Sequence, residues 1–175
     1  MRIVIVLALL ALSGCASAPR PAAFGGQIIL GADCREITGK YLNSASHSTG
    51  EGAESMSSLL GRIVPDPAAK SAPVSFVLSF PANRVLRIAY FDLKGGDAGE
   101  IELREQRSEY RCGDGVLQIA SGVERFFSTG TETLVFSRTT GNYLMVRRSS
   151  VRLAPAGGGI SLPGMREDWY VFTPL

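Results

Sequence analysis

The hydrophobic and polar positions divide the chain into regions with different periods. Residues 3–12 are apolar without a break, and residues 43–58 are small and polar with no period. From residue 74 onward apolar and polar positions mostly alternate, as they do in strands that bury one face. The pattern therefore predicts a short apolar leader followed by a domain that consists mainly of strands.

One short helix is expected at 55–63. Its apolar positions follow the helical spacing i, i+3, i+4 and i+7, and they are Met56, Leu59, Leu60 and Ile63. Ser55 can cap the first turn, and Pro65 and Pro67 prevent the helix from continuing. The helix is expected to cover an open end or face of a sheet.

The alternating regions predict strands separated by short turns. Strands are expected at 74–80, 85–91, 100–104, 133–138, 143–148 and 169–172, with an Asp114-Gly115 turn between two more and a loop at 154–164. Consecutive short strands joined in this way form an antiparallel meander. The expected fold is all-β with one short helix, as a curled sheet or a small barrel, and a β-sandwich is the alternative.

Several side chains can be assigned to a face from the alternation. Leu117 and Ile119 are expected to point inward, and Glu100 and Glu102 to share the solvated face of their strand. Neighbouring residues of a strand point to opposite faces, so Arg147 and Arg148 diverge. Arg148 is either an interior charge or a ligand contact, or it lies at an exposed edge. The exposed edge is the preferred interpretation.

The apolar run near the N-terminus is too short to span a membrane. Residues 3–12 would rise about 15 Å as a helix, against about 30 Å of hydrocarbon. Arg2 precedes the run and small residues follow it. These features are typical of a secretory signal peptide, which is expected to cover residues 1–14.

The residues that close this segment suggest a covalent anchor. Leu12-Ser13-Gly14-Cys15 resembles the lipobox of bacterial lipoproteins. The resemblance implies cleavage before Cys15, a diacylglycerol thioether on its sulfur and usually an acylated amino group. Ala16 stands where an aspartate would retain the protein in the inner membrane, which implies the periplasmic face of the outer membrane. The alternative is an ordinary signal peptide with a chance cysteine.

The remaining length and charge fit one exported domain. Residues 15–32 are expected to hold the lipidated cysteine and a flexible tether rich in Ala, Pro and Gly, and residues 33–175 to form a single β-rich domain. The formal net charge is +2 and there is no basic run. Nucleic acid is therefore not an expected partner.

The other two cysteines are expected to pair. If Cys15 carries lipid, Cys34 and Cys112 remain, and an even pair in an exported protein is most simply a disulfide. Two buried free thiols are the alternative. No CxxC or HxxxH spacing is present, so neither a metal site nor a cofactor is expected.

A second resemblance lies at the start of the domain. Cys34 followed by Gly39-Lys40-Tyr41 is similar to the opening of small envelope lipoproteins of Gram-negative bacteria, and also to the Gly-x-Trp opening of lipocalins. The first resemblance implies an envelope protein. The second implies a lipocalin-like barrel that binds a small apolar ligand or lipid. A plain strand with a packed tyrosine is the simpler reading.

No catalytic motif stands out in the sequence. The only histidine, His47, lies in the polar segment 43–58, where a mobile loop would not hold it against a neighbouring serine. There is no GxSxG, P-loop or GxGxxG pattern. The expected function is therefore a non-catalytic structural or protein-interaction role in the cell envelope, with a membrane and other envelope proteins as partners. The alternative is the lipocalin-like binder.

Overall fold

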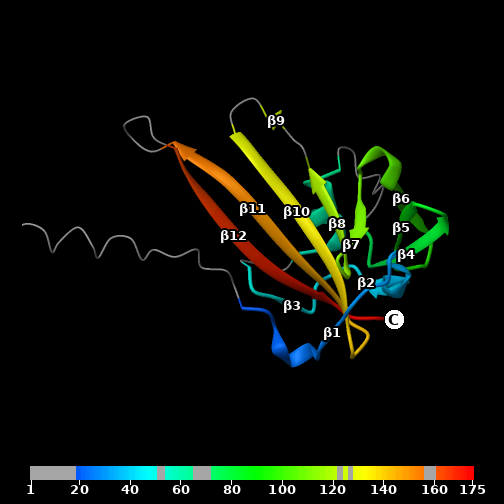
Figure 1. The fold of residues 1–175 in the computed structure, drawn as a ribbon. Coiled ribbons are helices and arrows are strands. Elements are labelled where there is room, and N and C mark those ends of the chain that lie inside the picture. The colour runs from blue at the N-terminus through cyan, green and yellow to red at the C-terminus, as the bar shows by residue number, and fades with distance from the viewer. Residues whose placement is uncertain (1–18, 51–53, 65–71, 122–123, 126–127, 156–160) are drawn as a thin grey trace, which may run out of the picture.

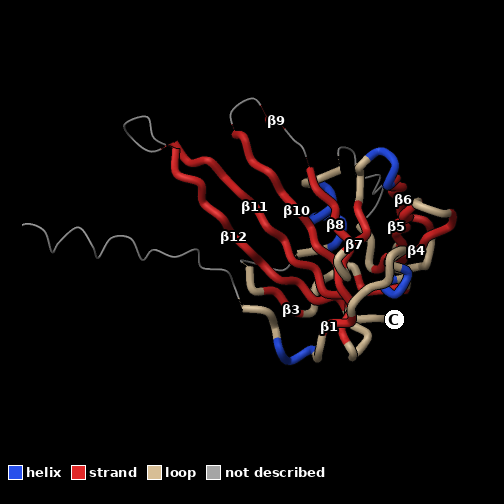
Figure 2. Tube along the Cα trace, in the orientation of Figure 1, coloured by secondary structure: helices blue, strands red, loops and turns tan. Residues whose placement is uncertain are grey.

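The computed structural model describes residues 19–50, 54–64, 72–121, 124–125, 128–155 and 161–175. Figures 1 and 2 show that these residues are mostly in strands, and they include one α-helix. The strands are β1 (Gln27–Ile28), β2 (Gly39–Leu42), β3 (His47–Ser48), β4 (Ser75–Ala82), β5 (Val85–Phe91), β6 (Asp97–Arg104), β7 (Arg111–Gly113), β8 (Val116–Ser121), β9 (Glu124–Arg125), β10 (Ser128–Thr139), β11 (Leu144–Pro155) and β12 (Ser161–Phe172). The helices are α1 (Met56–Gly61) and three short 3-10 turns, η2 (Ala22–Phe24), η3 (Arg35–Ile37) and η4 (Glu105–Arg107). The expectation of an all-β fold with one short helix is confirmed.

The described strands form two antiparallel sheets. The larger has the order β3-β12-β11-β10-β8-β7, with β1 and β9 added against β10. The smaller has the order β2-β4-β5-β6. Hairpins join most neighbours in both sheets, as a meander requires.

The two sheets are connected along one side and separate along the other. Beyond β12 the chain pairs with β2 through a bridge between Tyr41 and Pro174, flanked by hydrogen bonds from Leu42 N to the Thr173 carbonyl and from Leu175 N to the Lys40 carbonyl. On the other side β6 and β7 are edge strands of different sheets. The described sheets are thus strongly curled around one interior and do not close into a barrel.

Large side chains from both sheets fill this interior. The fully buried aromatic residues are Tyr41, Phe76, Tyr90, Phe136, Tyr170 and Phe172. Leu117 and Ile119 of β8 also point inward, as the alternation predicts. Both sheets contribute to a single cluster of buried residues, so burial of apolar surface holds them together.

Helix α1 forms where its spacing predicts it. Ser55 is the N-cap and accepts a hydrogen bond from Ser58 N at 3.1 Å. Met56, Leu59 and Leu60 are buried in the shared core. The helix therefore packs its apolar face over the interior, and residues 65–67, which were expected to stop it, lie outside the described part.

The segment expected as a tether is packed against the domain from residue 19 onward. Residues 19–30, here called the N-terminal strap, include η2 and β1, and β1 pairs with β10. Phe24 contacts His47 and Tyr143, with ring centroids 5.5 and 5.2 Å apart. Leu30 is buried and its N–H donates to the Gly115 carbonyl. Backbone pairing and a few apolar side chains thus hold this segment against the domain, although its Ala, Pro and Gly content is typical of a flexible tether.

Strands β11 and β12 are longer than the sequence predicts. Residues 154–155 and 161–164, expected within a loop, belong to these strands, and residues 152–155 pair with 161–164 at the far end of the hairpin. Pro163 is tolerated because β12 pairs on its other side only at Tyr170 and Val171, so that edge is otherwise free near Pro163 in the described structure. Residues 156–160 lie outside the described residues.

Candidate functional site

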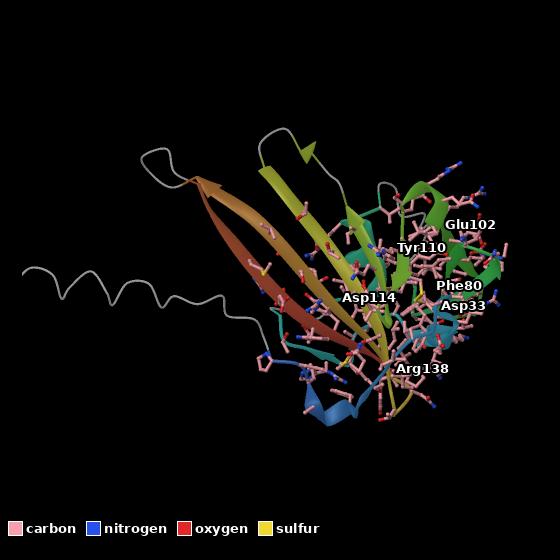
Figure 3. The ribbon with its side chains drawn as sticks, viewed as in Figure 1. Asp33, Phe80, Glu102, Tyr110, Asp114 and Arg138 are labelled. Atoms are coloured by element: carbon pink, nitrogen blue, oxygen red, sulfur yellow. A yellow bond between two sulfur atoms is a disulfide. The ribbon has the colours of Figure 1, made fainter. Side chains whose placement is uncertain are left out.

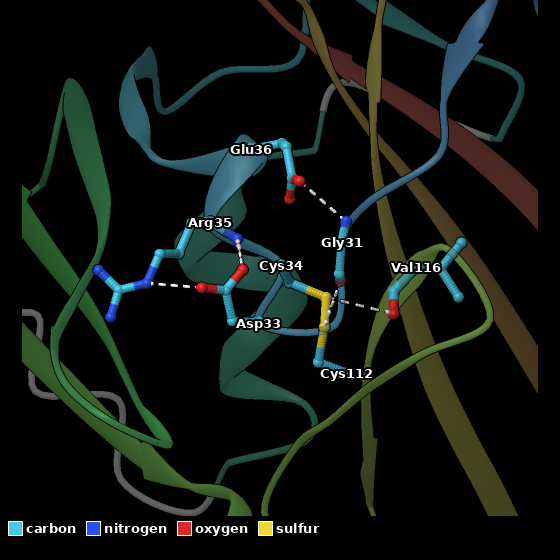
Figure 4. Close-up of a disulfide and its surroundings, with 7 residues drawn as sticks. All are labelled: Gly31, Asp33, Cys34, Arg35, Glu36, Cys112 and Val116. Atoms are coloured by element: carbon cyan, nitrogen blue, oxygen red, sulfur yellow. Dashed lines mark hydrogen bonds and ion pairs between the residues drawn. A yellow bond between two sulfur atoms is a disulfide. The ribbon is translucent and has the colours of Figure 1, made fainter.

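Cys34 and Cys112 form a disulfide, as expected (Figure 4). Their Cα atoms are 5.9 Å apart and they lie 78 positions apart in the sequence. The Cys34 sulfur lies 3.5 Å from the Val116 carbonyl oxygen, and the Cys112 sulfur 3.3 Å from that of Gly31. The bridge therefore fastens the segment that follows the N-terminal strap to the β7–β8 hairpin.

One cysteine of the chain is not part of this bridge. Cys15 is the third cysteine of the chain, and it lies outside the described residues. Since Cys34 and Cys112 are bonded to each other, neither is available for lipidation. Any covalent anchor on a cysteine must therefore use Cys15.

A cavity of about 420 Å³ lies beside the disulfide, near the side where β6 and β7 remain separate. Its wall comes from three places: the segment after the strap, the β4–β5 hairpin, and the connection from β6 to β7. The lining residues are Ala32, Asp33, Arg35, Phe80, Ala82, Asn83, Arg84, Glu105, Tyr110 and Cys112. Figure 3 labels Asp33, Phe80 and Tyr110 on this side of the molecule.

Two ion pairs line the cavity. Arg35 Nε lies 2.8 Å from Asp33 Oδ2, and Arg84 Nε lies 3.5 Å from Glu105 Oε2. Arg35, Asp33 and Arg84 are each more than half exposed, so solvent screens these pairs and each contributes only about 0–1 kcal/mol to stability. The cavity wall thus carries two positively and two negatively charged side chains whose pairing is weak.

Two aromatic rings form the apolar part of the cavity. Phe80 and Tyr110 meet edge to face with centroids 6.4 Å apart. Tyr110 is only 4% exposed, and its hydroxyl makes no hydrogen bond to any residue that the structure describes. Burial raises the pKa of Tyr110, and Glu105 raises it further while Arg84 lowers it. The neutral hydroxyl is therefore free to bond to a molecule in the cavity.

A second polar group is buried between the larger sheet and the segment before α1. Arg148 is 6% exposed and its guanidinium lies near three carboxylates, at 3.1 Å from Glu132, 3.7 Å from Asp168 and 3.8 Å from Glu54. Arg148 Nη1 also donates to the Tyr170 hydroxyl at 3.3 Å. Burial raises the pKa of Tyr170, so it remains a neutral hydrogen-bonding group.

The preferred expectation for Arg148 was therefore wrong. Arg148 lies on the inner face of β11, while Arg147 lies outside, with its guanidinium 5.8 Å from the centre of the Trp169 ring and 3.4 Å from Glu167. The alternation of side chains along a strand correctly predicted that the two arginines point to opposite faces of the sheet. It could not show that Asp168 and Glu132, on the two neighbouring strands, would supply Arg148 with buried counter-charges.

The other titratable candidates lie apart from the cavity. His47 belongs to edge strand β3, not to a loop, and its ring packs against Phe24. Glu100 and Glu102 are exposed on β6, where Glu100 pairs with Arg87 and Glu102 lies 4.0 Å from Arg104. These carboxylates are solvated, as the strand pattern indicates.

Within the described ranges, no cluster of His, Cys, Asp or Glu has the makings of a metal site. The same part of the chain contains no helix with the length and apolar character needed to cross a membrane. No protein-family model, no curated protein and no solved structure matches the chain. Its function is therefore inferred from its own residues.

Proposed function

We propose that the protein is a lipid-anchored, periplasm-facing lipoprotein of the bacterial outer membrane, with a non-catalytic structural or protein-interaction role. The observation that carries the proposal is the disulfide between Cys34 and Cys112. Disulfides persist in oxidising compartments, which supports export. The bridge also leaves Cys15, directly after the apolar run, as the one cysteine available for lipid.

The anchor itself is supported by simple energetics. Each buried CH₂ adds about 0.8 kcal/mol of membrane affinity, and stable attachment needs roughly two acyl chains. A diacylglycerol on Cys15 supplies them. The described domain begins at residue 19, and four extended residues span at most about 14 Å. The proposal therefore places the N-terminal strap close to the membrane surface.

The interior polar groups support a structural role. The charge of Arg148 is surrounded by Glu54, Glu132 and Asp168, and Arg166 and Arg62 pair with two of these carboxylates. Such a mutually neutralised group fastens the segment before α1 to the larger sheet. It uses its charges within the domain and presents none of them as an isolated nucleophile or base.

The alternative function is a lipocalin-like binder of a small apolar ligand or lipid. That function requires an apolar cavity between the sheets. Fully buried rings, including Phe76, Phe136 and Phe172, occupy the described interior. The cavity beside the disulfide is instead lined by charged side chains. The alternative therefore has less support than the anchored envelope role.

The proposal is tested in bacterial cells that express the full chain. Cells are fed an alkyne-bearing fatty acid, and the protein is examined for the label and for its membrane fraction. Cys15→Ser is expected to abolish labelling and to leave an unprocessed or soluble precursor. The double variant Cys34→Ser/Cys112→Ser is the control and is expected to keep the label. Labelling that survives Cys15→Ser would refute the anchor.

The interaction role is tested by crosslinking intact cells and identifying captured proteins, with mass spectrometry of bound lipids in parallel. The same envelope protein recovered repeatedly with the wild-type chain supports the role. One reproducible bound lipid and no protein partner would instead favour the apolar-ligand binder.

A further inference from the structure

We propose that the cavity beside the disulfide binds a small zwitterion of the amino-acid class, either a free amino acid or a dipeptide, with an apolar or aromatic side chain. This inference does not depend on the lipid anchor. It rests on the size of the cavity, on its paired charges and on the aromatic side chains in its wall.

The cavity has the right size for such a molecule. Its volume of about 420 Å³ falls at the small end of the range of about 300–1,000 Å³ that is typical of ligand sites. Ala32 and Ala82 are among the lining residues, and their short side chains leave the space open. The disulfide fixes one wall, because it ties Cys112 to the segment that carries Asp33 and Arg35.

The charges of the cavity match both ends of a zwitterion. Arg35 and Arg84 can donate to a carboxylate, while Asp33 and Glu105 can accept from an ammonium group. Their present ion pairs are solvent-screened, so a ligand can replace part of them at small cost. Because the four formal charges sum to zero, a ligand with no net charge suits the cavity better than a simple anion or cation.

The aromatic wall accounts for the apolar part of the ligand. A ligand side chain can pack against Phe80, which is only partly buried, while the Tyr110 ring lies beneath. The Tyr110 hydroxyl has no partner among the described residues and lines the same cavity. The hydroxyl is therefore placed to donate a hydrogen bond to a bound carboxylate or amide.

The backbone at Arg84 gives independent support. Arg84 occupies the turn between β4 and β5 with φ of 60°, in the left-handed region that favours glycine. Of the two residues that join the strands, only Arg84 has a positive φ, and glycine adopts such a φ at the least cost. An arginine at this position makes the turn less stable than a glycine would, and its side chain lines the cavity. Such backbone strain is found at sites where the side chain serves a function.

Binding is tested by calorimetric titration of the purified full-length protein in detergent micelles. The probes are L-phenylalanine and glycyl-L-phenylalanine, which separate the free amino acid from the dipeptide. L-phenylalanine amide lacks the carboxylate, and 3-phenylpropionate lacks the ammonium group. At least one of the two zwitterions is expected to bind, and each truncated analogue is expected to bind at least tenfold more weakly.

The decisive variant is Arg84→Gly. It relieves the left-handed strain, so the urea midpoint is expected to rise, whereas affinity for the zwitterion falls at least tenfold. Tyr110→Phe, which keeps the ring, is expected to weaken binding severalfold. Arg104→Gln is the control, because Arg104 lies on β6 and does not line the cavity, and it should bind like wild type.

Three results would overturn the inference. The first is that neither zwitterion binds to the folded wild-type protein. The second is that 3-phenylpropionate binds as tightly as phenylalanine, which would make the site an ordinary anion site. The third is that Arg84→Gly is stable and retains full affinity. The inference is supported if the wild-type protein binds the zwitterion and Arg84→Gly binds it more weakly while unfolding at a higher urea concentration.

Discussion

The rings of Phe76 and Phe172 meet edge to face with centroids 5.6 Å apart, although β4 and β12 belong to different sheets. Tyr41 also stacks on Phe76, and the centroids of these two rings are 5.5 Å apart. These aromatic contacts join the two sheets in the interior, near the edge where Tyr41 and Pro174 bridge them. The packing of the sheets therefore depends on a filled core.

Phe76→Ala is expected to destabilise the protein by about 3–5 kcal/mol, because it leaves a cavity where both sheets meet. Urea unfolding followed by far-UV circular dichroism measures this loss. Leu42→Ala is the control, since Leu42 lies on the exposed side of neighbouring β2 and should change stability by less than about 1 kcal/mol. Equal effects of the two variants would show that Phe76 is not packed as described.

Tyr90 and Tyr41 provide a matched test of buried hydroxyl groups. The Tyr90 hydroxyl is buried with no hydrogen-bond partner in the described structure, whereas the Tyr41 hydroxyl donates to the Ile37 carbonyl at 3.0 Å. Tyr90→Phe is expected to be neutral or stabilising, and Tyr41→Phe to cost about 1 kcal/mol. Chemical unfolding at pH 8 compares the two, and a larger loss for Tyr90→Phe would contradict the structure.

Tyr90 also makes the stability of the folded protein depend on pH. Burial raises the pKa of Tyr90 far above its usual value near 10, so the folded state keeps a proton that the unfolded state releases. The free energy of unfolding is therefore unaffected by this group below about pH 10 and falls as the pH rises further, because the folded state resists forming a buried phenolate. Between pH 9 and pH 11, the free energy of unfolding of Tyr90→Phe is therefore expected to fall less than that of the wild type, in unfolding measurements of short duration.

Arg148→Ala is expected to cost about 3–5 kcal/mol, because Glu132 and Asp168 would lose the buried cation on the strand that lies between theirs. Arg147→Ala, on the outer face of the same strand, is the matched control and should cost less than about 1 kcal/mol. Urea midpoints measure both. If the two arginines proved equally dispensable, the inward position of Arg148 would be wrong.

The disulfide is expected to contribute about 4 kcal/mol, since it closes a long loop in the unfolded chain. Neither Cys34 nor Cys112 should react with an alkylating reagent under denaturing conditions until a reductant is added. The reduced protein should then unfold at a lower urea concentration. Alkylation of both residues in denatured, unreduced protein would show that the bridge is absent.

Much of the fold could be predicted because its signals are local. The spacing of Met56, Leu59 and Leu60 defines one helical face, and Val85–Phe91 is a strand with the bounds that its sequence indicates. The Asp114-Gly115 turn also follows directly from its residues, and both have positive φ angles. These features depend on neighbours in the chain, which a single sequence contains.

The candidate site could not be predicted in the same way, because its parts are brought together by the tertiary fold. Asp33, Arg84 and Glu105 come from three separate segments, and no spacing in the sequence links them. The left-handed backbone of Arg84 is likewise seen only in the structure. Similarly, the burial of Arg148 depends on its cross-strand partner Asp168.

The mass of the mature N-terminal peptide tests the central claim most directly. The full chain is expressed in a bacterium, extracted from the membrane and digested, and the first peptide is analysed by mass spectrometry. The account predicts a peptide that begins at Cys15 and carries a diacylglycerol thioether, with a further acyl chain on its amino group. A mature chain that begins at any other residue, or at an unmodified Cys15, would contradict it.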